Sequence, residues 1–183
     1  SRSALKDDLN LTVETIRKFE KDKLIKGIVI RIDSPGGAVA PSQEMYEAVK
    51  RAKAAKPLVV SMGSTAASGG HYIAVAADKI FANSGTVTGS IGVITQLYNV
   101  ELLLRRAKVD VNSITTGEFK DAGSPFKEFT QTDQAYFQTL IDDIYEQFVE
   151  DVAAGRKMEV EKVKEYADGR VFTGRQAKEM GLV

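Results

Sequence analysis

The sequence contains no cysteine and a single histidine, His71. Without cysteine the chain can form no disulfide, no thiolate nucleophile and no cysteine-ligated metal site. A catalytic zinc ion usually takes several imidazole ligands, so one histidine argues against a zinc site built from this chain alone. We therefore expect neither a bound metal nor another cofactor.

The chain also lacks a net charge and a long apolar run. Its 25 basic residues balance 25 acidic residues, so no overall field would attract nucleic acid or an anionic membrane surface. No apolar run reaches the length of a membrane span, and no signal peptide is visible. The sequence opens inside a helical pattern and stops at Val183, so we expect the trimmed core of a longer protein. We expect residues 1–183 to form one domain with a substantial core.

Apolar residues alternate between the spacing of strands and that of helices along the whole chain. Short β-branched runs bounded by glycine or proline indicate buried strands, and apolar residues three or four apart indicate helices. The expected strands are 27–32, 57–61, 79–82, 91–95, 111–115 and 171–172, and the expected helices are 9–19, one beginning near Pro41, 72–77, 100–107, 133–153, 160–166 and 174–180. This order is typical of an α/β fold with a mainly parallel sheet covered by helices.

Ser68 lies in the segment that points most directly to chemistry. It belongs to Met-Gly-Ser-Thr-Ala-Ala-Ser-Gly-Gly (62–70), between an expected strand and an expected helix. Backbone amides at the start of a helix are unpaired and can hold a developing negative charge, so a serine here has the surroundings of a nucleophile. The alternative is a turn of small residues that only allows close packing, and this segment taken alone favours that alternative.

A second candidate loop, Asp-Ser-Pro-Gly-Gly (33–37), follows the expected strand 27–32. Two glycines let the backbone turn sharply and approach a ligand closely. Loops that follow parallel strands meet at one edge of a sheet. The amides of Gly37 and Gly69 are therefore candidates for an oxyanion hole beside Ser68. An ordinary turn into the next helix is the alternative interpretation of this loop.

A nucleophilic serine also needs a base, and two residues compete for that role. His71 lies three residues after Ser68, but a side chain on a helix packs back over its own turn, and no nearby carboxylate orients it. Lys120 lies in the irregular segment 116–125 after an expected strand, so its loop can reach the same sheet edge. The local pattern favours packing for His71 and a solvated position for Lys120, and leaves the choice open.

Five motifs in a fixed order resemble the signal peptide peptidase A family of bacterial and archaeal serine proteases. They are Asp-Ser-Pro-Gly-Gly (33–37), Met-Gly-Ser-x-Ala-Ala-Ser-Gly-Gly (62–70), Thr-Gly-Ser-Ile-Gly-Val (88–93), Gly-Glu-Phe-Lys-Asp (117–121) and Asp-Gly-Arg-Val-Phe-Thr-Gly-Arg-Gln-Ala (168–177). Each motif is weak alone, whereas the ordered set is specific and spans residues 24–183. The resemblance implies a Clp protease/crotonase-like fold made of repeated β-β-α units.

The resemblance also implies a role for each matching residue. Ser68 corresponds to the nucleophile and Lys120 to the general base of a Ser-Lys dyad, Ser90 to the hydroxyl that orients the lysine, and the amides of Gly37 and Gly69 to the oxyanion hole. A lysine with its ordinary pKa of about 10.4 must be desolvated before it can act as a base near neutral pH. His71 stands where the family commonly has an aromatic residue.

Substrates, partners and location follow from the same resemblance. Family members degrade remnant signal peptides and other hydrophobic or unfolded polypeptides. They are anchored in the membrane by an N-terminal segment that is missing here, with the protease domain outside the cytoplasm. Members with one copy of the domain form a ring-like homo-oligomer, in which Lys120 would come from a neighbouring subunit. We accordingly expect peptide substrates and a homo-oligomer, and no nucleic-acid partner.

Three other functions fit part of the sequence. A Clp-type triad requires a histidine well downstream of the serine, and none follows His71. Crotonase-like enzymes that act on acyl-CoA thioesters combine an oxyanion hole with carboxylates and lack this serine nucleophile. A catalytically inactive scaffold in membrane protein quality control is the remaining alternative, and the retention of Ser68, Ser90 and Lys120 argues against it.

Overall fold

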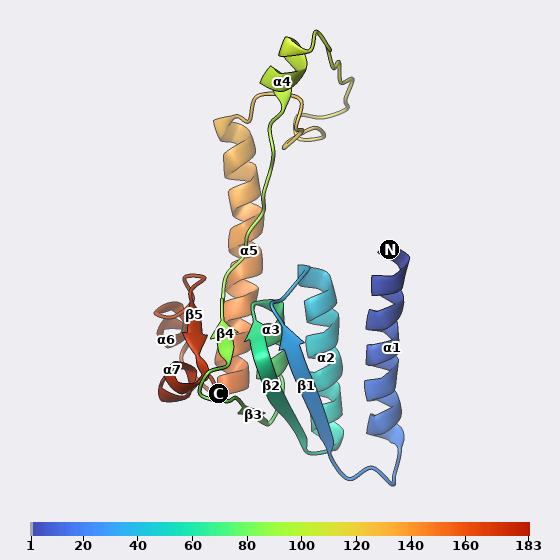
Figure 1. Ribbon diagram of the computed structural model, residues 1–183, viewed down its shortest axis with the longest axis vertical. Helices are drawn as coiled ribbons and strands as arrows, with labels where there is room; N and C mark the ends of the chain where they lie inside the picture. Colours follow the sequence, from blue (N-terminus) through green and yellow to red (C-terminus); the bar gives the residue numbers. More distant parts are fainter. Residues whose placement is uncertain (1) are drawn as a thin grey trace. The chain divides into compact units, whose positions relative to one another are not determined.

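The computed structural model describes residues 2–183, with side chains from residue 10 onward. In chain order the elements are α1 (Arg2–Lys21), β1 (Ile28–Ser34), α2 (Val39–Ala55), β2 (Leu58–Ala67), α3 (Gly69–Val75), β3 (Lys79–Phe81), β4 (Val87–Gly89), α4 (Glu101–Arg106), α5 (Gln131–Arg156), α6 (Val160–Lys164), β5 (Val171–Thr173) and α7 (Gly174–Glu179) (Figure 1). The chain divides into two compact units, of which the first runs to Gly92 and resumes at Tyr145, and the second is Val93–Ile144. The expectation of one protease domain over 1–183 stays a prediction.

The first unit is built on a mainly parallel sheet with the strand order β1-β2-β4-β5 (Figure 1). The central strand β2 is long enough to pair with two strands on one side: its Val59–Ser61 segment pairs with β3, and its Thr65–Ala67 segment with β4. Strands β1, β3 and β4 all run parallel to β2, and β5 runs antiparallel to β4. This arrangement confirms the predicted α/β fold.

The core of the first unit lies between this sheet and the helices that pack on it. Leu58, Val60 and Met62 of β2 are buried, whereas the residues between them are partly exposed, because successive side chains of a strand point to opposite faces. Helices α2 and α3 pack against each other and against the sheet. An aromatic contact joins α3 to α5, since the rings of Tyr72 and Phe148 lie 4.8 Å apart at 71°.

The second unit contains α4, turns and extended segments, and the first half of α5. Its large apolar side chains are unusually exposed for a globular unit, and the most exposed are Ile94, Tyr98, Leu102, Leu103 and Ile114. No helix in the described part of the chain is long and apolar enough to cross a membrane.

Two expected strands, 91–95 and 111–115, are absent from the described structure. Both segments contain β-branched residues but have no neighbouring strand to pair with, and Ile94 and Ile114 are 79% and 101% exposed. The strand predictions for these two segments, which rested on their residue composition, were therefore wrong, because the tertiary structure offers no strand for them to pair with. The strand expected at 57–61 instead continues to Ala67, because its second half finds a partner in β4.

Candidate active site

Ser68 occupies the junction between β2 and α3 in an uncommon backbone conformation. Its φ of 50° and ψ of −121° put it in a region that non-glycine residues rarely adopt. The Ser68 amide donates to the carbonyl of Gly89 at 2.8 Å, and its carbonyl accepts from the amide of Tyr72 at 2.9 Å. Its hydroxyl does not cap α3, so the side chain is available for chemistry at a half-buried position.

The loop 33–37 lies directly against Ser68. Gly36 has a φ of 107°, and a Cβ atom placed on it would lie 2.8 Å from both the Gly69 nitrogen and the Ser68 Cβ. A Cβ placed on Gly69 would lie 3.3 Å from the Gly37 nitrogen. The amides of Gly37 and Gly69 are therefore neighbours beside Ser68, and a side chain at Gly36 would prevent this close approach. Two adjacent backbone amides next to a hydroxyl are the groups from which an oxyanion hole is built.

Asp33 ties this loop to β2. Its Oδ1 accepts from the amide of Thr65 at 3.0 Å, and a Cβ atom at Gly63 would lie 2.5 Å from the Asp33 carboxyl carbon. The pairing of β1 with β2 shifts register between Ile32 and Ser34. The loop that contacts Ser68 begins directly after this irregularity.

Ser90 lies beside Ser68 because of the register between β2 and β4. Ala67 pairs with Gly89, so Ser68 and Ser90 are the residues that follow a matched pair of parallel strands. Ser90 also has a positive φ, of 52°, and its amide donates to the carbonyl of Arg170 at 2.8 Å. Both serines leave their strands at the same edge of the sheet.

The segment 168–177 packs against β4 and the loop that follows it, on the side of β4 away from β2. A Cβ atom at Gly89, whose φ is 78°, would lie 2.6 Å from the ring of Phe172. The Gly169 amide donates to the carbonyl of Ile91 at 3.0 Å. These contacts give the C-terminal motif a structural role: it holds the loop that carries Ser90.

His71 is fully buried and faces β4. Its Nδ1 lies 3.0 Å from the hydroxyl of Thr88, and that hydroxyl donates to the carbonyl of Ala66 at 2.6 Å. Since the hydroxyl proton is already used, Nδ1–H is the donor, and Nε2 has no partner within the described part of the chain. Burial, assisted by the charge of Arg156, lowers the pKa of His71 to about 4. The histidine is neutral near pH 7 and joins α3 to β4.

Lys120 lies in the second unit, in a series of turns between Gly117 and Gly123, and its side chain is exposed. The strand expected before this loop does not form, so that part of the sequence argument was wrong. The structure thus gathers Gly37, Ser68, Gly69 and Ser90 in the first unit and positions the turns that carry Lys120 within the second.

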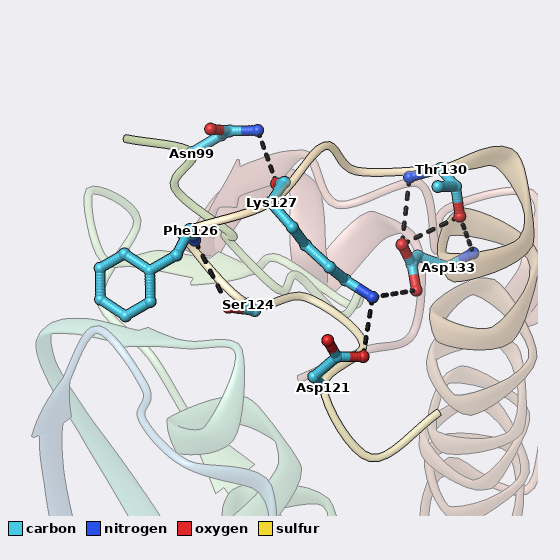
Figure 2. Close-up of polar contacts among 7 residues, drawn as sticks. All are labelled: Asn99, Asp121, Ser124, Phe126, Lys127, Thr130 and Asp133. Carbon is cyan, nitrogen blue, oxygen red and sulfur yellow. Dashed lines mark hydrogen bonds and ion pairs between the residues drawn. The ribbon is translucent and has the colours of Figure 1, made fainter. Parts of the chain in front are cut away.

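A polar network next to Lys120 was missed by the sequence analysis. The ammonium of Lys127 lies 2.8 Å from Asp121 Oδ1 and 3.9 Å from Asp133 Oδ1 (Figure 2). Thr130 and Asp133 form reciprocal bonds at the start of α5, since the Thr130 amide donates to Asp133 and the Asp133 amide to the Thr130 hydroxyl, each at 3.1 Å. The Thr-x-x-Asp spacing before the helix could have signalled this cap.

The groups gathered at Ser68 are its hydroxyl, backbone amides and a second serine. Among the described residues, no group of three or more histidine or acidic side chains could hold a metal ion. A free hydroxyl, paired backbone amides and a second serine suit attack on a carbonyl carbon.

Comparison with known proteins gives two family matches. The family described as Peptidase family S49 matches residues 50–183, and the family described as Clp protease matches residues 3–88. The second match agrees with the α/β fold.

Individual relatives carry protease names. The Synechocystis sp. protein "Putative protease slr0021" is 50% identical over 166 residues, which are 91% of this chain and 60% of that protein. "Putative signal peptide peptidase SppA" of Enterococcus faecium is 40% identical over 169 residues, which are 92% of this chain and 49% of that protein. "Serine protease SPPA, chloroplastic" of Arabidopsis thaliana is 36% identical over 172 residues, which are 93% and 25% of the two proteins. The chain spans between a quarter and three-fifths of these relatives.

Proposed function

The chain belongs to peptidase family S49, the family of signal peptide peptidase A, and we propose that it is a serine endopeptidase with a Ser-Lys dyad. Ser68 is the nucleophile and Lys120 the general base. Ser90 orients the lysine, and the amides of Gly37 and Gly69 form the oxyanion hole. The observation that carries the proposal is the meeting of Ser68 with the two glycine amides and Ser90 at one sheet edge.

The proposed roles of these residues define the reaction. Neutral Lys120 takes the hydroxyl proton as Ser68 Oγ attacks a peptide carbonyl, and the oxyanion that forms accepts bonds from the two amides. The lysine ammonium then protonates the leaving amine, and the peptide bond breaks. Lys120 next takes a proton from the water that attacks the acyl-enzyme, and it gives this proton to Ser68 Oγ as the ester bond breaks and the carboxylic acid product leaves. His71 takes no part, because it is buried and bonded to Thr88.

The exposure of Lys120 supports a role for assembly. In water a lysine is almost entirely protonated near neutral pH, so it must be covered before it can act as a base. The second unit exposes Ile94, Leu102 and Ile114 at 79%, 70% and 101%, and such exposed apolar side chains suit contact with another copy or with an apolar peptide. We infer a homo-oligomer whose subunits complete each other's dyads.

The substrates proposed are remnant signal peptides and other hydrophobic or unfolded polypeptides. An anchoring segment outside this sequence would hold the protease domain at the membrane on the extracytoplasmic side. Such a location supplies apolar peptides that have just left the bilayer. The relative named as a signal peptide peptidase supports this substrate class.

Cleavage of a hydrophobic fluorogenic peptide by three variants tests the proposal. Ser68→Ala and Lys120→Ala each remove a dyad member, and we expect both to lower kcat by at least about a thousandfold. Ser64→Ala is the matched control, since Ser64 is an exposed serine of β2, the strand that precedes Ser68, and it should keep native activity. If Lys120→Ala cleaves normally while His71→Phe does not, the dyad is wrongly assigned. If the assembled native protein cleaves nothing, the scaffold function replaces the protease.

A further inference from the structure

The two residues that flank Lys120 are both linked to the start of α5, Phe119 directly through Tyr136 and Asp121 through Lys127. Asp121 is held by an ion pair and Phe119 by an aromatic stack. Lys120 lies between them with an exposed side chain. Its backbone is therefore held on both sides while its ammonium is left unobstructed.

The ionic anchor is a bridge of one cation between two carboxylates (Figure 2). Lys127 Nζ lies 2.8 Å from Asp121 Oδ1 and 3.9 Å from Asp133 Oδ1. Asp133 is 4% exposed, and its other oxygen accepts from the amide of Thr130 at 3.1 Å and from the Thr130 hydroxyl at 2.9 Å. These bonds fix Asp133 on α5. Lys127 contacts both Asp133 and Asp121, so it links Asp121 to the helix.

The aromatic anchor holds the other side. The ring of Phe119 stacks on Tyr136 of α5 with centroids 4.9 Å apart and an interplanar angle of 25°. Two turns link the anchors, since the Ala122 amide donates to the carbonyl of Phe119 at 3.2 Å and the Ser124 amide to that of Asp121 at 3.0 Å. Phe119 and Asp121 thus belong to one folded series of turns that rests on α5.

Lys120 and Lys127 have different surroundings, since the side chain of Lys120 is exposed and that of Lys127 is paired with Asp121. The bond to Asp121 raises the pKa of Lys127, and the charge of Asp133 adds to this effect. Lys127 is therefore kept as a cation and is unsuited to act as a base. A surface ion pair also contributes little to the free energy of unfolding. Stabilisation of the fold is therefore not a sufficient reason for Lys127 to bridge two carboxylates beside the proposed base.

We propose that Asp121, Lys127 and Asp133 form a clamp that positions Lys120 for proton transfer. The inference rests on the proposed function, because it assigns the clamp to the base of that reaction. The clamp residues touch neither substrate nor reacting atoms and are positioning residues. A base must lie within hydrogen-bond reach of the proton that it removes, and misplacement by about 1 Å can cost about a hundredfold in rate.

Steady-state kinetics on the full chain with the same fluorogenic peptide test the clamp. Lys127→Met removes the bridging charge and keeps an unbranched side chain, and Lys127→Arg keeps a charge that can bridge two carboxylates. Asp121→Asn removes the ionic partner with little change in shape. Lys162→Met is the matched control, because Lys162 forms a surface ion pair with Glu165 at 2.6 Å in the first unit.

We expect Lys127→Met and Asp121→Asn to lower kcat by about 10- to 100-fold, with KM within about twofold of native. Lys127→Arg should recover kcat to within about threefold, and Lys162→Met should match the native protein. Melting temperatures should stay within about 2 °C of native for all four variants. The clamp is refuted if Lys127→Met keeps native kcat, if Lys127→Arg is as impaired as Lys127→Met, or if the loss follows a lower melting temperature.

Two further variants in the same assay separate this inference from the proposed function. If Ser68→Ala or Lys120→Ala retains cleavage, the dyad itself fails and the clamp loses its purpose. If both abolish cleavage while Lys127→Met and Asp121→Asn keep native kcat, the dyad stands and the clamp alone is rejected.

Discussion

At the scale of single residues, Ser68 and His71 show how residues three positions apart take different roles. Ser68 lies between β2 and α3 with a positive φ, and its hydroxyl does not cap α3. His71 turns inward and bonds to Thr88. A non-glycine residue with positive φ costs about 1–3 kcal/mol, so the surrounding structure must hold Ser68 in place, and the backbone bonds of Ser68 to Gly89 and Tyr72 are contacts that do so.

The buried histidine predicts a pH dependence of stability. Its pKa is about 4 in the folded protein and 6.5 in the unfolded chain, so between these values the unfolded state binds the proton and the folded state does not. Stability is therefore complete above the unfolded pKa and falls as the pH falls toward 4. The loss attributable to His71 between about pH 7 and about pH 4.5 is roughly 2 kcal/mol.

Urea unfolding of the native protein and His71→Phe near pH 7 and near pH 4.5 measures this effect. Carboxylates titrate equally in both proteins, so the difference between their pH dependences isolates the histidine. The variant should lose roughly 2 kcal/mol less than the native protein on acidification and should keep most of its cleavage activity. Equal losses in the two proteins would contradict a neutral buried His71.

At the scale of elements, the site depends on how β1 and β2 end. The loop after β1 lies so close to Ser68 and Gly69 that Gly36 has no room for a side chain. Parallel strands bring such loops together whatever their distance in the sequence.

Gly36→Ala tests this packing. The new methyl group would lie 2.8 Å from the Gly69 nitrogen and the Ser68 Cβ, at a φ of 107° that alanine rarely adopts. We expect the displaced amides to lower kcat by at least about a hundredfold, which is the usual effect of losing one oxyanion donor. Gly85→Ala is the control, because a Cβ there meets no atom within 4 Å. Native kcat in Gly36→Ala would exclude this loop from the site.

Local sequence was a good guide to the elements that have local causes. The apolar spacing of α5 and the strand–turn–helix order around Ser68 were predicted because each signal lies in the segment itself. The extent of β2 and the absence of strands at 91–95 and 111–115 were not predicted, because they depend on which distant segments pair. The bridge of Lys127 is likewise a contact between side chains of separate turns, which periodicity does not encode.

At the scale of the whole molecule, the two residues of the proposed dyad lie in different compact units. Ser68 belongs to the first and Lys120 to the second. The second unit also exposes large apolar side chains that a lone copy would leave in water. These features lead to the prediction that cleavage depends on assembly.

Replacing an exposed leucine of each unit tests that dependence. Leu102 of α4 is 70% exposed and Leu24 of the first unit is 87% exposed. We expect Leu102→Glu to shift the protein toward monomers in sedimentation velocity and to lower cleavage by at least about tenfold, because a charge in an apolar contact is costly. Leu24→Glu should preserve both assembly and cleavage. Full activity of monomeric Leu102→Glu would show that one copy suffices.

Covalent labelling of Ser68 by a fluorophosphonate, mapped by mass spectrometry, tests the central claim most directly. We predict one adduct, on Ser68, in the native protein, and a labelling rate at least about a hundredfold lower in Lys120→Ala, because the base that activates the hydroxyl is gone. An adduct on another residue, or equal labelling of Ser68 in the two proteins, would contradict the Ser-Lys dyad.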